Sequence, residues 1–586
     1  MAATRDIGTP SVEERSRSPY AEASDRAARP GYPRVVTTTH TRPGTPAPLS
    51  DLGTHEVTNQ VPPRADGDLL GADPAVVEAS DREGGDRAAL ESLAERIGTA
   101  AHREHARAAN AHEPELHTHD RTGHRIDEVG FHPSWHELMR VSVEHGLAAA
   151  PWAAAPGTGA HVTRAAGFYL HSQVEQGHLC PISMTYAAVP ALQHAPELAA
   201  AYLPGLTARS YEPGLADPAT KSGLLAGMSM TEKQGGSDVR SGSTVAVPQP
   251  DGSYRLTGHK WFTSAPMNDL FLTLAQAPGG LTCLVLPRVL PDGTRNAIRL
   301  QRLKDKLGNR SNASSEIEYS GAAGWRVGEE GRGVRTIIEM VSMTRLDCVL
   351  GAAGTQRAAV TEAAHHVAHR SAFGARLADQ PLMREVVAEL AAESEAATVL
   401  ALRLAGAVDR GETALLRLAL PAAKYLVCKR TSAVVAEALE CLGGNGYVEE
   451  SDLPRLYREA PLNSIWEGSG NVTALDVLRA IAREPAAVDA LLAEIDLGAG
   501  SDPRLDAVIA ALRAELAAPQ ERRARRLAEL AALALQGSLV VRHAPAAVAD
   551  VLLASRLDGD GPLRTAGTRP GSDAVGTLLE RATPGR

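Results

Sequence analysis

The spacing of apolar residues changes along the chain, and each change predicts a different kind of structure. Between residues 75 and 225, apolar positions recur at helical spacing, which is typical of amphipathic helices. We therefore place an N-terminal α domain at 62–226. The helices predicted most clearly within it lie at 88–97, 133–143 and 165–175.

Between residues 227 and 330 the apolar period shortens to two, the period of a half-buried strand. Two pairs of such runs flank turns rich in Gly and Pro, which predicts two β-hairpins. This part is expected to form a compact antiparallel β domain. The predicted strands lie at 243–247, 253–258, 270–275, 281–286 and 315–319.

The helical period returns in long, Ala-rich runs over residues 331–484. Short connections between these runs favour an up-down bundle. Beyond this bundle we place an extra helical domain at 485–560, so that the fold class is α+β. The predicted helices of the bundle lie at 358–368, 383–408 and 414–439. Those of the extra domain lie at 505–516, 521–535 and 538–554.

Both ends of the chain lack a regular apolar period. Residues 1–61 are rich in Thr, Ser, Pro, Gly and Arg, and cannot bury enough apolar surface to offset the entropy of ordering. We expect a disordered tail there, whose basic stretch at 29–34 is interpreted as a solvated arm rather than a nucleic-acid contact. Residues 561–586 are rich in Gly and Pro and are expected to be a flexible tail.

Composition narrows the possible partners. The formal net charge of the 586 residues is -10, so nucleic-acid binding would require a local basic patch. The five cysteines are scattered and include no C-x-x-C pair, which argues against a disulfide framework and predicts a cytoplasmic protein. No apolar run approaches the ~20 residues that span a bilayer, and the N-terminus has no apolar signal segment.

Histidines are frequent in the N-terminal region, and His132 and His136 are four residues apart. This spacing could place them on one helix face, as zinc ligands are placed. No H-E-x-x-H motif and no nearby cysteine accompanies them. We therefore expect no metal site and interpret both as surface or core histidines.

One carboxylate, Glu467, lies between bulky apolar residues and the small residues that follow it. Apolar neighbours exclude water and raise the pKa of a carboxyl group toward the range of a general base. The glycines beyond it would let a ligand approach the backbone, and Asn471 offers both donors and an acceptor. Taken alone, this segment is better interpreted as a buried or helix-capping glutamate beside a turn.

A second stretch, M-T-E-K-Q-G-G-S-D at 230–238, changes that interpretation. Its two glycines free backbone N–H groups to face a bound group, while Thr231 and Ser237 add hydroxyls. This combination suits a polar ring edge or a pyrophosphate. A third stretch at 258–265 pairs aromatic side chains with hydroxyls, so that an aromatic ring could stack on a planar cofactor. Singly, each stretch could also be a glycine turn or a strand end.

Two further pieces follow in the chain. The sequence R-S-A-F-G begins at Arg370, and E-C-L-G-G-N-G-Y begins at Glu440, followed by R-L-Y-R-E and then W-E-G. In this order and spacing, the four pieces resemble the acyl-CoA dehydrogenase family over about residues 88–482. The resemblance implies an N-terminal α domain, a middle β domain and a C-terminal four-helix bundle, assembled as a homotetramer that binds FAD.

The stretches at 230–238, 302–314 and 463–471 are similar to the AidB-like branch of this family, which carries an extra C-terminal helical region. The branch consists of flavoproteins linked to protection of DNA against alkylation. The resemblance implies binding of duplex DNA, with weak or residual acyl-CoA dehydrogenation. The alternative is a true acyl-CoA dehydrogenase with no role on DNA.

The resemblance also implies roles for individual residues. Glu467 would be the catalytic base, because Thr344 leaves empty the base position of the isovaleryl branch. Phe262 would stack on the flavin ring, and the Ser264 hydroxyl would lie near flavin N5. The residues expected to bind FAD are Met230, Thr231, Gly236, Ser237, Phe262, Thr263, Ser264, Gly443, Gly444, Ile465, Ser469, Gly470 and Asn471. Those expected to reach the FAD of a neighbouring subunit are Arg370, Phe373 and Gln380.

The DNA contacts are expected where basic residues are densest after residue 485. By itself this basic run could be a solvated helix face, so the expectation of duplex DNA depends on the resemblance. A tetramer would gather four modest patches into one stronger surface. The candidate DNA-binding residues are Arg479, Arg522, Arg523, Arg525 and Arg526.

One residue departs from the family pattern at the expected flavin site. Glu440 stands where the family often has Gln, and its negative charge near a pyrophosphate must be turned away, protonated or paired.

Overall fold

The computed structural model describes residues 54–557, 566–568 and 574–583. The chain divides into two units, residues 1–58 and 59–586, and residues 54–58 of the first unit form no helix or strand. Of the tail expected to be disordered at 1–61, residues 1–53 lie outside the described residues, whereas Asn59 is hydrogen-bonded to Ser371. Half of the flexible tail expected at 561–586 also lies outside them. The architecture below is that of the second unit.

The N-terminal part of this unit is mainly helical, as the apolar period predicts. All three predicted helices are present, although the third ends at Ser172 rather than at 175. The helices are α1 (Pro74–Glu83), α2 (Arg87–Ile97), α3 (Ala100–Ala111), α4 (Pro133–Glu144), α5 (Ala160–Ser172), α6 (Leu179–Leu192) and α7 (Pro196–Leu206).

An antiparallel strand pair interrupts these helices in the histidine-rich stretch that was expected to be helical. It consists of β1 (Glu115–His119) and β2 (Arg125–Gly130). Polar side chains occupy both faces of β1, whose residues are exposed or half-buried in alternation. Such a ribbon has no apolar stripe, so an analysis based on apolar period does not detect it.

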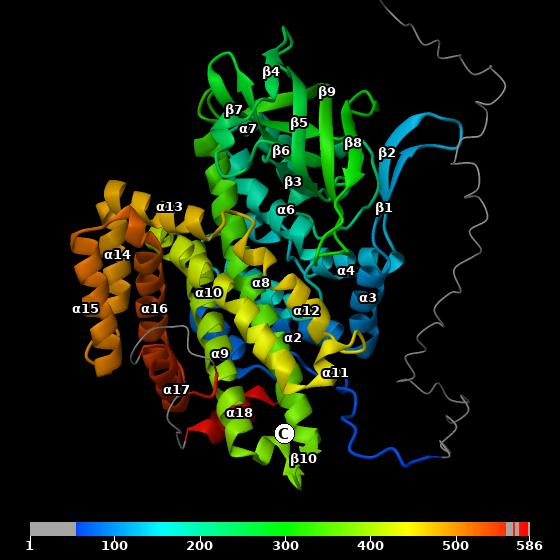
Figure 1. Cartoon of the computed structure of the whole chain (residues 1–586). Helices are drawn as coiled ribbons and strands as arrows, with labels where there is room; N and C mark the ends of the chain where they lie inside the picture. The colour runs from blue at the N-terminus through cyan, green and yellow to red at the C-terminus, as the bar shows by residue number, and fades with distance from the viewer. Residues whose placement is uncertain (1–53, 558–565, 569–573, 584–586) are drawn as a thin grey trace, which may run out of the picture. The chain divides into compact units, whose positions relative to one another are not determined.

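The middle part is a seven-stranded sheet, which Figure 1 shows above the helical bundle. Both predicted hairpins are present, as β4–β5 and β6–β7. The expectation of a purely antiparallel sheet is wrong, because β3 and β4 each pair with β6 in parallel. The strands are β3 (Ala226–Ser229), β4 (Val245–Pro248), β5 (Tyr254–Ser264), β6 (Leu270–Ala277), β7 (Gly280–Pro287), β8 (Ile298–Leu303) and β9 (Ser314–Val327).

The bundle is built on three long helices, α8 (Gly333–His369), α9 (Pro381–Asp409) and α10 (Thr413–Cys441). The run predicted at 358–368 is only the last third of α8, which has 37 residues. Residues 344–361 of α8 are buried on every side, so the middle of the helix shows no polar face from which a helical period could be recognised. A short hairpin, whose strands β10 (Ser371–Ala372) and β11 (Ala375–Arg376) have two residues each, connects α8 to α9.

In Figure 1, α13 to α17 lie along one side of the bundle, α11 and α12 lie toward the other side, and α18 lies near its lower end. The break predicted at 535–538 does not occur, and α16 continues until Pro545, which cannot extend it. The helices are α11 (Gly444–Tyr447), α12 (Leu453–Glu459), α13 (Gly470–Arg483), α14 (Pro485–Asp496), α15 (Pro503–Ala517), α16 (Ala524–His543), α17 (Ala546–Arg556) and α18 (Val575–Ala582).

Helix α18 lies within the region that was expected to be a flexible tail. Val575, Leu578 and Ala582 are buried in the same core cluster as α9. Arg581 forms an ion pair at 2.9 Å with Glu395, a side chain of α9 that is almost fully buried. The C-terminal segment is therefore anchored by burial and by charge, which its Gly- and Pro-rich surroundings conceal in the sequence.

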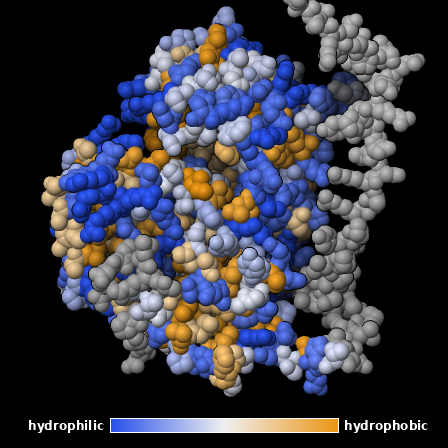
Figure 2. All heavy atoms as spheres, viewed as in Figure 1, coloured by the Kyte–Doolittle hydropathy of each residue, from blue (hydrophilic) through white to orange (hydrophobic). Residues whose placement is uncertain are grey.

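The cores are filled largely by Ala and Leu, and all five cysteines are buried and free. On the face drawn in Figure 2, hydrophobic residues occur in small groups among hydrophilic ones. Among the described residues, no helix combines the length and the hydrophobicity needed to cross a bilayer.

Candidate functional site

The backbone turns sharply at Trp466-Glu467-Gly468, immediately before α13. Both Glu467 (φ 56) and Gly468 (φ 99) adopt left-handed conformations. This conformation costs a residue other than glycine on the order of 1–3 kcal/mol, so the surroundings of Glu467 must impose it.

Two cations from distant helices hold this corner. Lys424 of α10 is 1% exposed. Its Nζ donates to the carbonyl oxygens of Trp466 at 2.6 Å and Gly468 at 2.5 Å. Arg345 of α8 donates from Nε to the carbonyl oxygen of Glu467 at 3.0 Å. Three successive carbonyls therefore accept hydrogen bonds from two fixed positive charges.

The Glu467 side chain is oriented by Thr344, whose Oγ1 donates to Glu467 Oε2 at 2.7 Å. Burial raises the pKa of Glu467 above its ordinary value, while the Thr344 hydrogen bond and the charges of Lys424 and Arg345 act in the opposite direction. The raised pKa and the fixed position are those of a general base. Thr344, which stands at the base position of the isovaleryl branch, thus contacts the carboxylate that is expected to be the base.

The loop that follows β3 is anchored by a buried ion pair. Glu232 is 2% exposed. Its carboxylate accepts from Lys260 Nζ at 2.8 Å and from the backbone N–H of Ser243 at 2.6 Å. The hydrogen-bonding capacity of the Glu232 carboxylate is therefore filled within the protein, and this side chain serves to position the loop. Thr231 is fixed to β5, since its carbonyl accepts from the Trp261 N–H at 2.8 Å. The sequence analysis missed both charges of this pair, although each lies within a quoted motif.

Ser264, at the end of β5, lies beside a group of polar side chains. Its hydroxyl is hydrogen-bonded to that of Ser314 at 3.3 Å, and Lys306 Nζ donates to Ser314 Oγ at 3.1 Å. Burial lowers the pKa of Lys306 to about 8. Burial raises the pKa of Cys180 to about 11, and both a hydrogen bond with Ser264 and the charge of Glu467 also influence it. Ser264 and Glu467 therefore lie around the same cysteine.

Of the side chains near Ser264, some face the expected flavin site and others face the interior of the sheet. Trp466 packs against the cluster that contains Met230 and Ala265, which joins the Glu467 corner to the β domain. Phe262 is 49% exposed, and Lys304 Nζ lies 4.7 Å from its ring centroid. Thr263 is buried, with its hydroxyl bonded to that of Ser229 at 2.5 Å. Thr263 thus faces the sheet interior, unlike its neighbours Phe262 and Ser264.

A second group of the expected residues lies at the opposite end of the bundle. Arg370 is roughly 39 Å from Thr344 along α8, at 1.5 Å per residue. Phe373 is fully exposed at the tip of the β10–β11 hairpin, with φ 53, and Gln380 Nε2 donates to the Ala372 carbonyl oxygen at 3.1 Å. Figure 1 shows β10 at the bottom and α13 near the top of the bundle.

Gly443 and Gly444 belong to this distant group, because they follow the end of α10 farthest from Lys424. Both are exposed, and a β-carbon at either position would have no atom within 4 Å. Glu440 beside them is exposed to solvent, and its charge helps to raise the pKa of Glu437. One chain therefore cannot bring Arg370, Phe373, Gln380 and these glycines to the Glu467 corner.

The segment after the corner leaves several groups available. Ile465 is exposed, and the Ser469 hydroxyl makes no capping bond to α13. Asn471 is exposed, and its Oδ1 accepts from Arg525 Nε at 2.7 Å. Together with the exposed Phe262, these groups on either side of the corner fit a flavin dinucleotide, which needs an aromatic surface and hydrogen-bonding side chains.

The basic run of the extra region is not a single surface. Arg523 and Arg526 both bind Glu515, from their Nε atoms at 2.9 and 3.1 Å. Arg522 donates to Gln520 Oε1 at 2.9 Å, whereas Arg525 contacts Asn471. Arg479 is exposed and has no ion pair within the described residues. Two of the five expected DNA contacts are thus neutralised by a glutamate.

His132 and His136 do not form a site together. His132 Nδ1 accepts from the Ser134 N–H at 3.2 Å and so caps α4, whereas His136 Nδ1 is bonded to Tyr211 Oη at 2.7 Å. Within the described ranges, no three His, Cys, Asp or Glu residues are arranged to hold a metal ion.

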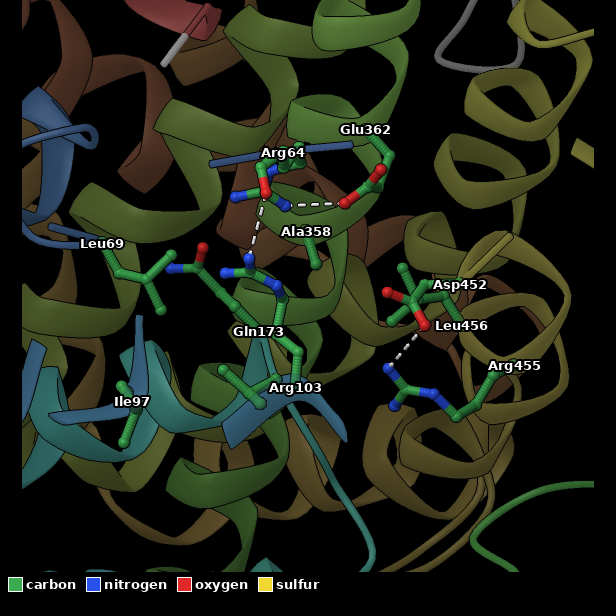
Figure 3. Close-up of a pocket in the computed structure, with 11 residues that line it drawn as sticks. Arg64, Leu69, Ile97, Arg103, Gln173, Ala358, Glu362, Asp452, Arg455 and Leu456 are labelled. Atoms are coloured by element: carbon green, nitrogen blue, oxygen red, sulfur yellow. Dashed lines mark hydrogen bonds and ion pairs between the residues drawn. The ribbon is translucent and has the colours of Figure 1, made fainter. Parts of the chain in front are cut away.

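A cavity separate from the Glu467 corner lies between the N-terminal helices and the bundle (Figure 3). Three arginines enter it, but Arg64 is paired with Glu362 at 2.6 Å and Arg455 with Asp452 at 3.6 Å. Arg103 is satisfied by the Arg64 carbonyl oxygen at 3.1 Å. This cavity is therefore interpreted as a structural junction between the two helical regions.

Three family descriptions match consecutive parts of the chain. The N-terminal domain of the adaptive response protein AidB matches residues 59–213, and the middle domain of acyl-CoA dehydrogenase matches residues 227–322. The C-terminal domain of acyl-CoA dehydrogenase matches residues 331–482.

Individual proteins agree with these matches. The putative acyl-CoA dehydrogenase AidB of Escherichia coli (strain K12) is 46% identical over 539 residues, which are 91% of this chain and 99% of that protein. Acyl-CoA dehydrogenase family member 11 of Caenorhabditis elegans is 33% identical over 64% of this chain and 63% of that protein. The crystal structure of Caenorhabditis elegans ACDH-11 in complex with C11-CoA matches with a TM-score of 0.75 and 26% identity, covering 90% of this chain and 93% of that one.

Proposed function

Because the chain belongs to the acyl-CoA dehydrogenase family, in its AidB-like branch, we propose that it binds duplex DNA and protects it against alkylation damage, with a residual acyl-CoA dehydrogenation at Glu467. The chain is an FAD-dependent oxidoreductase of this family. The observation that carries the enzymatic part is the Glu467 corner, where a carboxylate of raised pKa is hydrogen-bonded to Thr344 and lies between the fixed cations Lys424 and Arg345.

Glu467 removes the α-proton of the thioester. Thr344 occupies Oε2, which leaves Oε1 as the oxygen that takes the proton. The raised pKa of Glu467 improves the match to a weakly acidic C–H group, and the cations behind the corner keep the backbone from moving when the carboxylate becomes neutral. FAD, when bound, supplies the acceptor for the hydride that leaves the β-carbon.

On this chain the flavin ring would lie against Phe262 and Ser264, with Met230, Thr231, Gly236 and Ser237 along the anchored loop. Ile465, Ser469, Gly470 and Asn471 would line the dinucleotide. Thr263 would contribute only its backbone, since its side chain is bonded to Ser229. The remaining residues expected to bind FAD lie at the other end of the bundle within one chain: Arg370, Phe373, Gln380, Gly443 and Gly444. Their separation supports a homotetramer in which a neighbouring subunit supplies them.

Duplex DNA would be bound by the extra C-terminal region. Arg479 and Arg522 favour this, because neither forms an ion pair with a carboxylate within the described residues. Arg523 and Arg526 would have to release Glu515 or share it with a phosphate. The DNA surface is thus expected to be centred on Arg479 and Arg522.

Two measurements on the purified protein test the proposal. Anisotropy of a labelled duplex at two salt concentrations measures DNA binding, and acyl-CoA-dependent dye reduction measures turnover. We expect salt-sensitive duplex binding, and Arg479→Gln and Arg522→Gln should each lower the salt slope by about one, because each removes one cation from a phosphate. Rapid acyl-CoA turnover without duplex binding would instead establish the alternative, a true acyl-CoA dehydrogenase.

A further inference from the structure

Two cations converge on the segment that follows the catalytic corner. Arg525, near the start of α16, donates from Nε to Asn471 Oδ1 at 2.7 Å. Lys429 of α10 lies so close to Gly470 that a β-carbon there would be 2.9 Å from its Nζ and would collide with its Cε. The charges therefore come from two helices that are far apart in the sequence, and one of those helices belongs to the extra C-terminal region.

Neither cation has a carboxylate partner among the described residues. Burial, followed by the charges of Arg525 and Lys424, lowers the pKa of Lys429, which indicates positive charges held near one another. The nearest carboxylate along α16, Glu529, interacts electrostatically with Arg430 and Arg526. Arg523 and Arg526 differ, because they share Glu515.

Positive charges gathered without a carboxylate repel one another, and an anionic ligand removes that cost. The segment beside them has the access that a phosphate needs. Because Gly470 has no side chain, Lys429 Nζ can lie directly beside this backbone, and Asn471 is oriented with Oδ1 toward Arg525, so its amide N–H groups are available to donate to a ligand oxygen. Two cations and an amide donor suit an anion with several oxygens better than a single carboxylate.

We propose that Lys429, Arg525 and Asn471 form a binding site for a diphosphate, so that the extra C-terminal region completes the dinucleotide site of this chain. The inference rests on the proposed function, in which FAD supplies the diphosphate. Arg525 then leaves the set of expected DNA contacts and becomes a cofactor-binding residue. The same chemistry is offered by the diphosphate of CoA, which the experiment distinguishes.

The test compares Arg525→Gln and Lys429→Gln with the control Arg121→Gln in the full-length protein. Arg121 is exposed in the turn between β1 and β2, so its loss changes the net charge equally without touching the proposed site. Flavin-free protein is titrated with FAD, followed by flavin fluorescence, and with ADP or CoA, followed by the shift in melting temperature. We expect each variant to bind FAD about tenfold more weakly and to lose the ADP shift, whereas the control keeps both.

Conservative variants separate charge from folding. Arg525→Lys and Lys429→Arg should retain most of the FAD affinity, and all variants should keep the wild-type melting temperature without ligand. Loss of CoA binding with FAD binding unchanged would support the diphosphate site but assign it to the thioester. The proposal is overturned if Arg525→Gln keeps FAD and ADP binding, above all if it weakens duplex binding instead.

Failure of the proposed function has a different signature. If the wild-type protein cannot be loaded with FAD, that function is lost, yet an ADP shift that depends on Lys429 and Arg525 would still establish the diphosphate site. If FAD binds tightly and turnover occurs but neither variant differs from Arg121→Gln, the function stands and the site is refuted.

Discussion

The two ends of the helical bundle are built in opposite ways. At one end, the Glu467 corner is enclosed, and its three carbonyls accept from Lys424 and Arg345. At the other end, Phe373 is fully exposed at the tip of the β10–β11 hairpin, and the space around Gly443 is open. Both ends carry motifs of one cofactor site, although α8 separates them by roughly 39 Å.

This contrast teaches that burial and exposure can both mark function. The corner is rigid because proton transfer needs a carboxylate in a fixed position. An aromatic side chain that is fully exposed in a left-handed conformation has no stabilising role within its own chain, so a partner must account for it. In the proposed function the enclosed end supplies the chemistry, and the open end is expected to complete the site of a neighbouring subunit.

The largest expected effect breaks the enclosed end at its carboxylate. Glu467→Gln should keep the flavin but lower acyl-CoA turnover by about a thousandfold, because the amide cannot take the α-proton. Glu339→Gln, on the exposed part of α8, is the control and should leave turnover unchanged. Retained turnover in Glu467→Gln, measured by dye reduction, would show that another group is the base.

Mixing variants of the two ends tests whether they meet in one site. Phe373→Ala and Glu467→Gln should each be nearly inactive, yet tetramers assembled from equal amounts of both should recover about a quarter of the wild-type activity. The intact sites then take Glu467 from one subunit and Phe373 from the other. An inactive mixture, with mixed tetramers verified by mass spectrometry, would contradict a site shared between subunits.

Removing the cation behind the corner should have an intermediate effect. Lys424→Met leaves the carbonyls of Trp466 and Gly468 without their donor, and should lower the free energy of unfolding by about 2–4 kcal/mol. Turnover should fall by about thirtyfold as the corner loses its geometry. Denaturant unfolding and turnover are measured together, with Lys424→Arg as the variant that keeps the charge. Unchanged stability would mean that the corner keeps its conformation without the hydrogen bonds from Lys424.

The smallest effect concerns the orientation of the base. The Thr344 hydrogen bond lowers the pKa of Glu467, so Thr344→Val should raise that pKa further. Since the base works only when ionised, the acidic limb of the kcat/KM profile should move to higher pH. At acidic pH the rate should fall about fivefold, the equivalent of ~1 kcal/mol, while the alkaline plateau changes little. Thr344→Ser should behave like the wild type, and a limb that moves to lower pH would contradict this role.

Much of the fold could be predicted because its signals are local. The hairpins β4–β5 and β6–β7 follow from alternation around Gly-containing turns, and α9 and α10 follow from a sustained helical period. The failures occurred where the environment overrides the period. Burial on every side hid the middle of α8, and polar residues on both faces of β1 hid the β1–β2 pair.

The sequence by itself determined the family and the order of helical and β regions, and it nominated Glu467 as the expected base, because the motifs around Thr231 and Glu467 are contiguous stretches of chain. Only the tertiary structure decided what holds that base, since Thr344, Arg345 and Lys424 reach it from two helices more than forty residues away along the chain. It also separated Arg525 from the arginines beside it. The partner of a charge depends on which backbones approach in space, and no local pattern of residues records that approach.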